Sequence, residues 1–131
     1  MRKKKSLPKL KAELDKWFSL YIRLKHADHT GAVRCFTCGK LHHYKDIQNG
    51  HFQSRKYLAT RFDEDNCRPQ CVSCNIYNYG EQYKFATRLG AKKAHEMFKK
   101  ARQTAKWMRV DYDEKISYYK SIVNKFLTEL G

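Results

Sequence analysis

Four of the five cysteines in the chain stand in two Cys-x-x-Cys pairs, Cys35 with Cys38 and Cys71 with Cys74. Four thiolates at this spacing can surround one Zn²⁺ in a closed tetrahedron, which is typical of a structural rather than a catalytic metal. Two unrelated pairs of buried cysteines are the alternative, but such paired motifs seldom arise without a metal. The sequence therefore predicts a zinc site that pins together two segments separated by residues 39–70.

One histidine and two asparagines lie within or directly after this cysteine frame. His51 and Asn66 stand between the two pairs, and Asn75 directly follows Cys74. A histidine that titrates near neutrality can take a proton from water, and a side-chain amide oxygen can bind a divalent cation. An isolated histidine is more often an ordinary surface or core residue. The three residues together in a zinc frame favour a one-metal site that hydrolyses phosphodiesters.

The charge of the chain favours a polyanionic partner. Its 131 residues include 28 Lys and Arg against 13 Asp and Glu, which gives a formal charge of +15 and a pI near 9.7. Lysines and arginines that neutralise phosphates release condensed counterions, so nucleic acid is the expected partner. We expect no membrane contact, because no apolar run approaches the roughly 20 residues of a spanning helix. The zinc-type cysteine pairs, and a basic start without an apolar signal core, favour the cytoplasm.

Residues 1–30 are predicted to form an N-terminal amphipathic helix that opens near Ser6 and Pro8. Apolar and aromatic residues recur at helical spacing on one face, and charged residues fall on the other. The expected core stripe consists of Leu10, Leu14, Trp17, Phe18, Tyr21 and Leu24. The extreme basic N-terminus before the helix is expected to be disordered.

Residues 31–80 contain the predicted zinc core. Residues 35–52 are expected to form a short irregular hairpin, with 47–52 as its returning strand. A helix is expected to begin at Asn66 and to carry the second cysteine pair. The fifth cysteine, Cys67, is expected to be a small buried hydrophobe.

Residues 81–131 are predicted to form a basic helical tail. One helix is expected over 82–89, a second has an apolar stripe over 94–108, and a last helix opens with a capping box of Asp111 and Glu114. The chain is therefore predicted to be a single, mostly helical α+β domain with flanking N- and C-terminal helices.

Five stretches of the sequence resemble the phage NinG/Rap recombination endonuclease family. They are Phe18–Leu24, Cys35–Lys40, Gly50–Arg55, Ala59–Glu64 and Gln70–Asn75. The resemblance covers residues 10–90 well, and the helical tail is similar in character only. The spacing of His51, Asn66 and Asn75 resembles that of the His-Asn-His (HNH, or ββα-metal) nucleases. The Cys-x-x-Cys-Asn ending is similar to that of the phage junction-resolving endonuclease VII.

This resemblance implies a structure-selective DNA endonuclease that cuts branched recombination intermediates, such as Holliday junctions and D-loops, by metal-dependent hydrolysis. It implies a zinc-pinned ββα-metal core over residues 31–80. His51 would be the general base, Asn75 would bind a catalytic Mg²⁺ or Mn²⁺, and Asn66 would brace the loop that orients His51.

The same resemblance implies the setting in which the protein acts. The chain would be encoded by a phage or prophage and would act in the cytoplasm of the bacterial host. Its partners would be branched DNA and other recombination proteins. Because symmetric resolution of a four-way junction needs two active sites, a homodimer is expected.

The second protein ligand of the catalytic metal stays open at this stage. Many HNH nucleases have an acidic residue or a histidine directly before the base, whereas this chain has Gly50. The family resemblance favours Gln48. The alternatives are Asp46 and one of His42 or His43, although such histidines are more often exposed hairpin residues.

Several basic and aromatic residues are candidates for DNA contacts. Arg55 and Arg61 follow His51 in the same loop and would clamp phosphates, with a solvated basic loop as the alternative for Arg61. A basic helix face would hold a DNA arm without reading its sequence, through Lys92, Lys99, Lys100 and Arg102. Unpaired bases could stack on tyrosines, although core packing is expected for most of Tyr77, Tyr79, Tyr83, Tyr118 and Tyr119.

Two other functions fit parts of the pattern. A non-catalytic zinc DNA-binding protein would need the cysteines and the basic faces, but neither His51 nor Asn75. A sequence-directed or duplex-directed HNH endonuclease would use the same site on linear DNA and would show a base preference, which a junction enzyme should lack.

Overall fold

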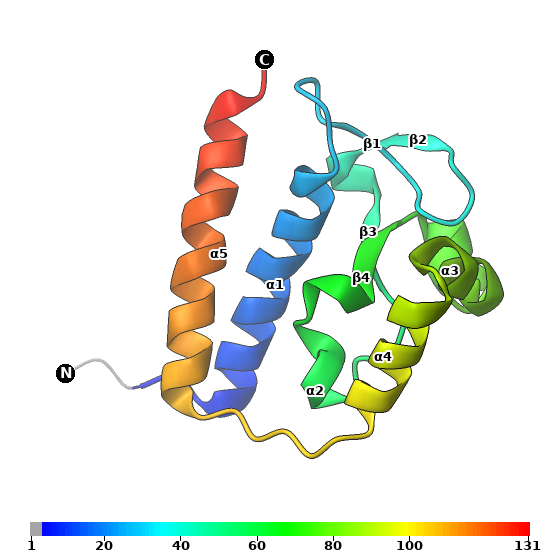
Figure 1. Ribbon diagram of the computed structural model, residues 1–131. Coiled ribbons are helices and arrows are strands. Elements are labelled where there is room, and N and C mark those ends of the chain that lie inside the picture. Colours follow the sequence, from blue (N-terminus) through cyan, green and yellow to red (C-terminus); the bar gives the residue numbers. More distant parts are fainter. Residues whose placement is uncertain (1–3) are drawn as a thin grey trace.

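The computed structural model describes residues 4–131. The disorder expected for the extreme basic N-terminus falls in part on residues 1–3, which lie outside that range. Two long helices stand side by side along one flank, and the short strands and remaining helices lie on the other side of α1 (Figure 1). The elements are α1 (Leu7–Lys25), β1 (Ala32–Arg34), β2 (Leu41–His43), η1 (Tyr44–Asp46), β3 (Gln48–His51), α2 (Leu58–Arg61), η2 (Glu64–Asn66), β4 (Cys67–Gln70), η3 (Ser73–Tyr77), α3 (Gln82–Leu89), α4 (Ala91–Ala101) and α5 (Arg109–Glu129).

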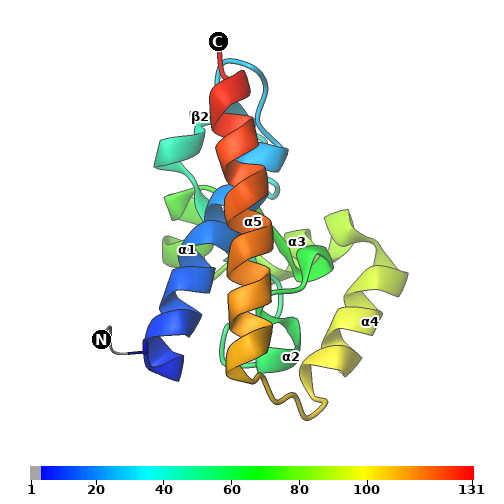
Figure 2. The same cartoon turned by 90° about the vertical axis from the view of Figure 1, so that its left-hand side faces the viewer.

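The predicted N-terminal helix is confirmed as α1, which packs against α5 with both helices running in the same direction (Figure 2). The Arg109 side chain donates to the Lys5 carbonyl oxygen at one end of the pair, and the Gly131 N–H donates to the His29 carbonyl oxygen at the other. The Ser6 hydroxyl caps the start of α1. The predicted stripe faces the core, where Leu10, Leu14, Phe18, Tyr21 and Leu24 are buried and Trp17 is partly buried.

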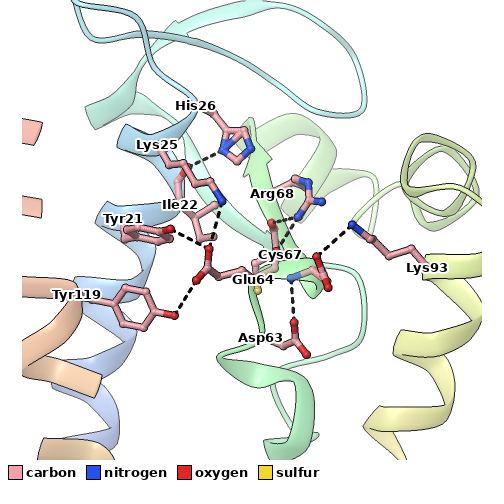
Figure 3. A network of polar contacts seen from close by, with 11 residues as sticks. Tyr21, Ile22, Lys25, His26, Asp63, Glu64, Cys67, Arg68, Lys93 and Tyr119 are labelled. Atoms are coloured by element: carbon pink, nitrogen blue, oxygen red, sulfur yellow. Dashed lines mark hydrogen bonds and ion pairs between the residues drawn. The ribbon is translucent and has the colours of Figure 1, made fainter. Parts of the chain in front are cut away.

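A polar network joins this helix pair to the central segments. The Glu64 carboxylate accepts hydrogen bonds from the Tyr21 hydroxyl at 2.8 Å and the Tyr119 hydroxyl at 3.3 Å (Figure 3). Burial alone would raise the pKa of Glu64, but hydrogen bonds from Tyr21 and Lys25 outweigh it and lower the pKa. On the far side of the same segment, Lys93 of α4 pairs with Asp65 at 3.1 Å. The network thus links α1, α5 and α4 through η2.

The strands form two separate antiparallel pairs, and here two predictions were wrong. β1 pairs with β2, while β3 pairs with β4, so that His51 lies opposite Cys67. Residues 47–52 therefore do not return onto the Cys35 segment. The helix expected from Asn66 is a strand as far as Gln70, and helical structure starts only after Cys71. Pairing with β3 outweighs local preference here, because β4 buries Cys67 and Gln70 completely.

The C-terminal part is helical, but two predicted helix ends were wrong. Helix α4 ends at Ala101, and residues 102–108 form a connection from which Trp107 packs on Phe62, with ring centroids 5.1 Å apart. Helix α5 begins at Arg109, because the Asp111 carboxylate accepts from the Met108 N–H at 2.7 Å. Asp111 is therefore the third residue of the helix and not its cap.

The predicted fold class is confirmed: the chain is a mostly helical α+β protein with small two-stranded sheets, a four-cysteine cluster and packed N- and C-terminal helices. Cys67 is fully buried, as expected. Within residues 4–131, the helices are too short or too polar to span a membrane.

Candidate metal centre and active site

The four paired cysteines meet at one point, as predicted. Their Sγ atoms all lie within 4.8 Å of one another, and those of Cys38 and Cys71 are 3.8 Å apart. A tetrahedral Zn²⁺ with Zn–S bonds of about 2.3 Å holds its sulfur ligands about 3.8 Å from one another. The cluster therefore has dimensions consistent with a structural zinc site.

The electrostatics of the cluster also fit a cation. Burial would raise the pKa of Cys35, but hydrogen bonds from the Cys71 N–H and the Thr37 hydroxyl outweigh it and lower the pKa to about 6. Burial and the adjacent thiols of Cys71 and Cys35 raise the pKa of Cys74 to about 12. One thiolate thus opposes ionisation of the next, and a divalent cation removes that repulsion.

The cysteine cluster holds Asn75 beside strand β3. Asn75 follows Cys74 in η3, and its N–H donates to the Cys71 carbonyl oxygen at 2.9 Å. Its side-chain amide nitrogen donates to Gln48 Oε1 at 2.8 Å. Two side chains predicted as ligands of a catalytic metal are therefore in direct contact.

A cavity of about 420 Å³ opens at this contact. Its lining comes from α1, β3, the loop after β3 and η3, and consists of Asp15, Ser19, Gln48, Asn49, His51, Arg55, Asn75 and Ile76. The cavity brings together four of the predicted site residues, namely His51, Gln48, Asn75 and Arg55.

The other candidates for a second metal ligand lie elsewhere. His42 and Asp46 line a different hollow, next to the cysteine cluster. His43 Nδ1 accepts a hydrogen bond from the Lys45 N–H at 3.3 Å. Of the four candidates, all within the described part of the chain, Gln48 is the one that shares a cavity with His51.

The environment of His51 fixes its protonation. Nε2 lies 2.9 Å from the Arg61 carbonyl oxygen. A carbonyl oxygen can only accept a hydrogen bond, so Nε2 carries the proton and Nδ1 keeps its lone pair. Burial, with the charge of Arg55 adding to it, outweighs the opposing hydrogen bond to the Arg61 carbonyl oxygen and lowers the pKa of His51 to about 4. The imidazole is therefore neutral near pH 7 and can accept a proton at Nδ1.

Asn66 lies outside the cavity and holds the loop that follows His51. Its side chain is fully buried, accepts from the Gln53 N–H at 2.7 Å, and donates to the carbonyl oxygens of Gln53 and Thr60 at 3.0 and 3.1 Å. The next residue after Thr60 is Arg61, whose carbonyl oxygen binds His51. These contacts hold the two ends of the loop between Gln53 and Thr60 together.

Gly50, the unexpected residue before His51, has a packing reason. A Cβ atom at this position would lie 2.1 Å from Gln70 Oε1. Gln70 is fully buried and is held by hydrogen bonds from its Nε2 to Thr37 Oγ1 at 3.1 Å and to the Gly80 carbonyl oxygen at 2.9 Å. Any side chain at position 50 would therefore displace Gln70.

With this geometry established, one comparison assigns the chain. It matches the family described as Bacteriophage Lambda NinG protein over residues 1–129. The chain belongs to the NinG family. This confirms the resemblance to the NinG family, and the match also covers the helical tail, which was expected to be similar in character only. Neither curated proteins nor solved structures gave a significant match.

Four residues that line this NinG protein's cavity were not predicted from the sequence: Asn49, Ile76, and Asp15 and Ser19 of α1. The Asp15 carboxylate accepts from Arg61 Nε at 3.1 Å and from the Arg61 Nη2 at 2.5 Å. The Arg61 Nη1 donates to the Arg55 carbonyl oxygen at 2.9 Å. The Arg61 side chain is thus engaged within the protein, and helix α1 thereby holds the residue whose carbonyl oxygen binds His51.

The predicted basic face on α4 is also partly engaged within the NinG protein. Lys100 pairs with Asp63 at 2.5 Å, and Arg102 donates to Gln53 Oε1 at 3.1 Å. The first contact joins α4, and the second joins the residue that follows α4, to the segment around the site. Lys92 and Lys99 are exposed and form no ion pair within residues 4–131.

Proposed function

We propose that this NinG protein is a metal-dependent DNA endonuclease of the HNH (ββα-metal) type that cuts branched recombination intermediates. The observation that carries the proposal is that neutral His51, with an unprotonated Nδ1, shares one cavity with the paired amides of Gln48 and Asn75. The order of β3, β4 and η3 around a four-cysteine cluster supports a zinc-pinned ββα-metal core.

His51 would act as the general base. A water molecule in the cavity would give a proton to Nδ1 while its oxygen attacks the phosphorus. The pKa of about 4 makes the free imidazole a weak base. A bound phosphate adds negative charge next to the ring, which raises its affinity for the proton. The hydrogen bond from Nε2 to the Arg61 carbonyl oxygen would keep the proton on Nε2 and leave Nδ1 free to accept one.

Arg55 is the residue best suited to bind the phosphate. It lines the cavity, its side chain is exposed, and a guanidinium matches the geometry of two phosphate oxygens. Arg61 would act indirectly, because its guanidinium is bound to Asp15. We assign Arg61 to the support of His51 and Arg55 to the substrate.

Gln48 and Asn75 would hold the catalytic Mg²⁺ or Mn²⁺. Both residues line the cavity and carry a side-chain amide oxygen, and oxygen is the donor that these ions prefer. The ion, when bound, would stabilise negative charge on the phosphate and on the leaving 3′ oxygen. Because both ligands are neutral amides, the substrate phosphate would supply the compensating negative charge.

The proposed substrate is branched DNA held without sequence readout. The net charge of +15 and the exposed Lys92 and Lys99 favour contacts to phosphates over contacts to base edges. Symmetric resolution of a four-way junction would need a homodimer. Other recombination proteins of the phage or the host would be its partners in the cell.

Cleavage assays test the proposal. The zinc-loaded protein should nick a supercoiled plasmid only when Mg²⁺ or Mn²⁺ is added, and should cut a synthetic four-way junction faster than a matched linear duplex. Asn75→Ala should raise the Mg²⁺ concentration needed for half-maximal rate, whereas the control Asn78→Ala, at an exposed position, should not.

Other outcomes would identify the alternatives. DNA binding without cleavage under any metal condition would leave a non-catalytic zinc DNA-binding protein. Sequence-dependent cuts in linear duplex would instead identify a duplex-directed HNH endonuclease.

A further inference from the structure

Three tyrosines that follow the cavity residue Ile76 in the sequence are turned to solvent. Tyr77, Tyr79 and Tyr83 are 75%, 88% and 86% exposed, in a segment that begins directly after Ile76 at the cavity wall. The core packing expected for most of the candidate tyrosines holds for Tyr119 but is wrong for these three and for Tyr118. Exposed aromatic side chains gathered in one segment are typical of a binding surface.

The backbone that carries these tyrosines is tightly constrained. Tyr79, Gly80 and Glu81 follow one another with φ angles of 54°, 84° and 49°, and a left-handed conformation is rare for a residue as bulky as tyrosine. Hydrogen bonds hold the turn in place: the Gly80 N–H donates to the Cys74 carbonyl oxygen at 2.8 Å, and the Gly80 carbonyl oxygen accepts from Gln70. Such constrained conformations cluster at ligand-binding sites.

A basic hollow continues from Tyr83 along helix α3. Tyr83, Lys84, Thr87 and Arg88 line about 510 Å³ of space together with Thr37 and Cys38. The opposite face of α3 is anchored by the fully buried Phe85, whose ring centroid lies 5.1 Å from that of Phe36 and 5.6 Å from that of Phe52. Helix α3 is thus fixed by Phe85 and carries Tyr83, Lys84 and Arg88 at the hollow.

We infer that the surface formed by Tyr77, Tyr79, Tyr83, Lys84 and Arg88 binds unpaired DNA bases and the adjoining backbone at the branch of the substrate. Aromatic faces that stack on bases, next to cations that follow phosphates, are the two elements of single-strand recognition. Bases within a duplex are already stacked and cannot use such a surface. The inference rests on the proposed function and deepens it, because it names the part of the DNA that would distinguish a branch from a linear duplex.

The test compares wild type with a double variant that carries both Tyr79→Ala and Tyr83→Ala. Binding is measured without added divalent ions to three labelled probes, namely a single-stranded oligonucleotide, a branched DNA with unpaired bases at the branch, and a matched linear duplex. We expect affinity for the first two to fall about tenfold or more, and affinity for the duplex to change less than about twofold. The pair Tyr79→Phe with Tyr83→Phe should retain binding. Tyr118→Ala is the matched control, since Tyr118 is 53% exposed on α5, on the opposite side of the molecule from α3 (Figure 1).

A second measurement uses wild type alone. The fluorescent base 2-aminopurine at the branch or in the single strand should be quenched on binding, because it stacks on tyrosine. The inference is overturned if quenching is absent, if the alanine variant binds all probes as wild type does, or if duplex affinity falls equally. In those cases the tyrosines would be free to serve a protein partner instead.

The two proposals fail in different ways. Wild-type protein that cuts branched DNA while the alanine variant binds normally would keep the nuclease and reject the tyrosine surface. Wild-type protein that cuts no DNA, but whose single-strand binding depends on the tyrosines, would reject the nuclease and keep the surface.

Discussion

Substitution of Gly50 by alanine should destabilise the protein although only one methyl group is added. The new Cβ would lie 2.1 Å from Gln70 Oε1 and 2.7 Å from Gln70 Cδ and Cγ. Overpacking of a buried site costs about 1–3 kcal/mol. Moving the Gln70 side chain would also break its hydrogen bonds to Thr37 and Gly80, which adds about 1–3 kcal/mol for buried groups left unpaired. We therefore expect Gly50→Ala to lower the free energy of unfolding by about 3 kcal/mol.

A double-mutant cycle isolates this clash from other effects of alanine. In a Gln70→Ala background the atoms that meet the new methyl group are gone, so Gly50→Ala should change the free energy of unfolding by less than about 1 kcal/mol. The interaction energy between the two substitutions should then be about 2 kcal/mol or more. Urea unfolding of the zinc-loaded proteins, followed by circular dichroism, gives the four values, with the slope checked for constancy. An equal penalty in both backgrounds would show that contact with Gln70 is not the reason for the glycine.

Three further predictions concern the zinc cluster, His51 and Asn66. Elemental analysis should find one zinc per chain. The Cys74→Ser variant should lose both its zinc and its fold, because metal binding is part of folding. The control Cys67→Ala, at a buried cysteine outside the cluster, should keep its zinc. Because burial lowers the pKa of His51 to about 4, kcat/KM for cleavage, which reports the pKa of the free protein, should hold down to about pH 5 and fall toward pH 4. A midpoint near the ordinary 6.5 would contradict an imidazole whose pKa is lowered by its surroundings. The same lowered pKa means that this group's contribution to stability is full above about pH 6.5 and is lost as the pH falls toward 4. Asn66→Ala should lower the free energy of unfolding by about 3–5 kcal/mol, because the backbone groups of Gln53 and Thr60 lose their buried hydrogen-bond partners. A loss no larger than that of Asn78→Ala would show that Asn66 does not hold the loop after His51.

Features that depend on residues close together in the sequence could be predicted. The stripe from Leu10 to Leu24 defines α1, because a helix face is set by spacing alone. The two Cys-x-x-Cys pairs define the four-cysteine cluster, because each pair forms its own turn. Gln48, which the family resemblance favoured as the second metal ligand, lies in contact with Asn75, and its role as a ligand stays a prediction.

Features that depend on distant partners could not be predicted. Strand β4 contains Pro69, which cannot donate a backbone hydrogen bond, and only its pairing with β3 makes it a strand. Asp15 looks like a solvated residue of an amphipathic helix until α1 packs against the site and its carboxylate meets Arg61. The exposure of Tyr79 depends on a turn whose residues have positive φ angles, and the spacing of apolar residues in the sequence does not reveal such a turn.

The sharpest test asks whether His51 is the general base. It compares cleavage of a synthetic four-way junction by wild type, His51→Ala and His95→Ala. His95 lies exposed on α4, away from the cavity lining, and serves as the matched histidine control. Removal of a positioned general base should lower the single-turnover rate by on the order of 10² to 10⁴, with zinc content, folding and junction binding unchanged. His95→Ala should cut at the wild-type rate. Near-normal cutting by a folded, zinc-loaded His51→Ala protein would contradict the account, because the cavity around Gln48 and Asn75 would then not be where the phosphodiester is hydrolysed.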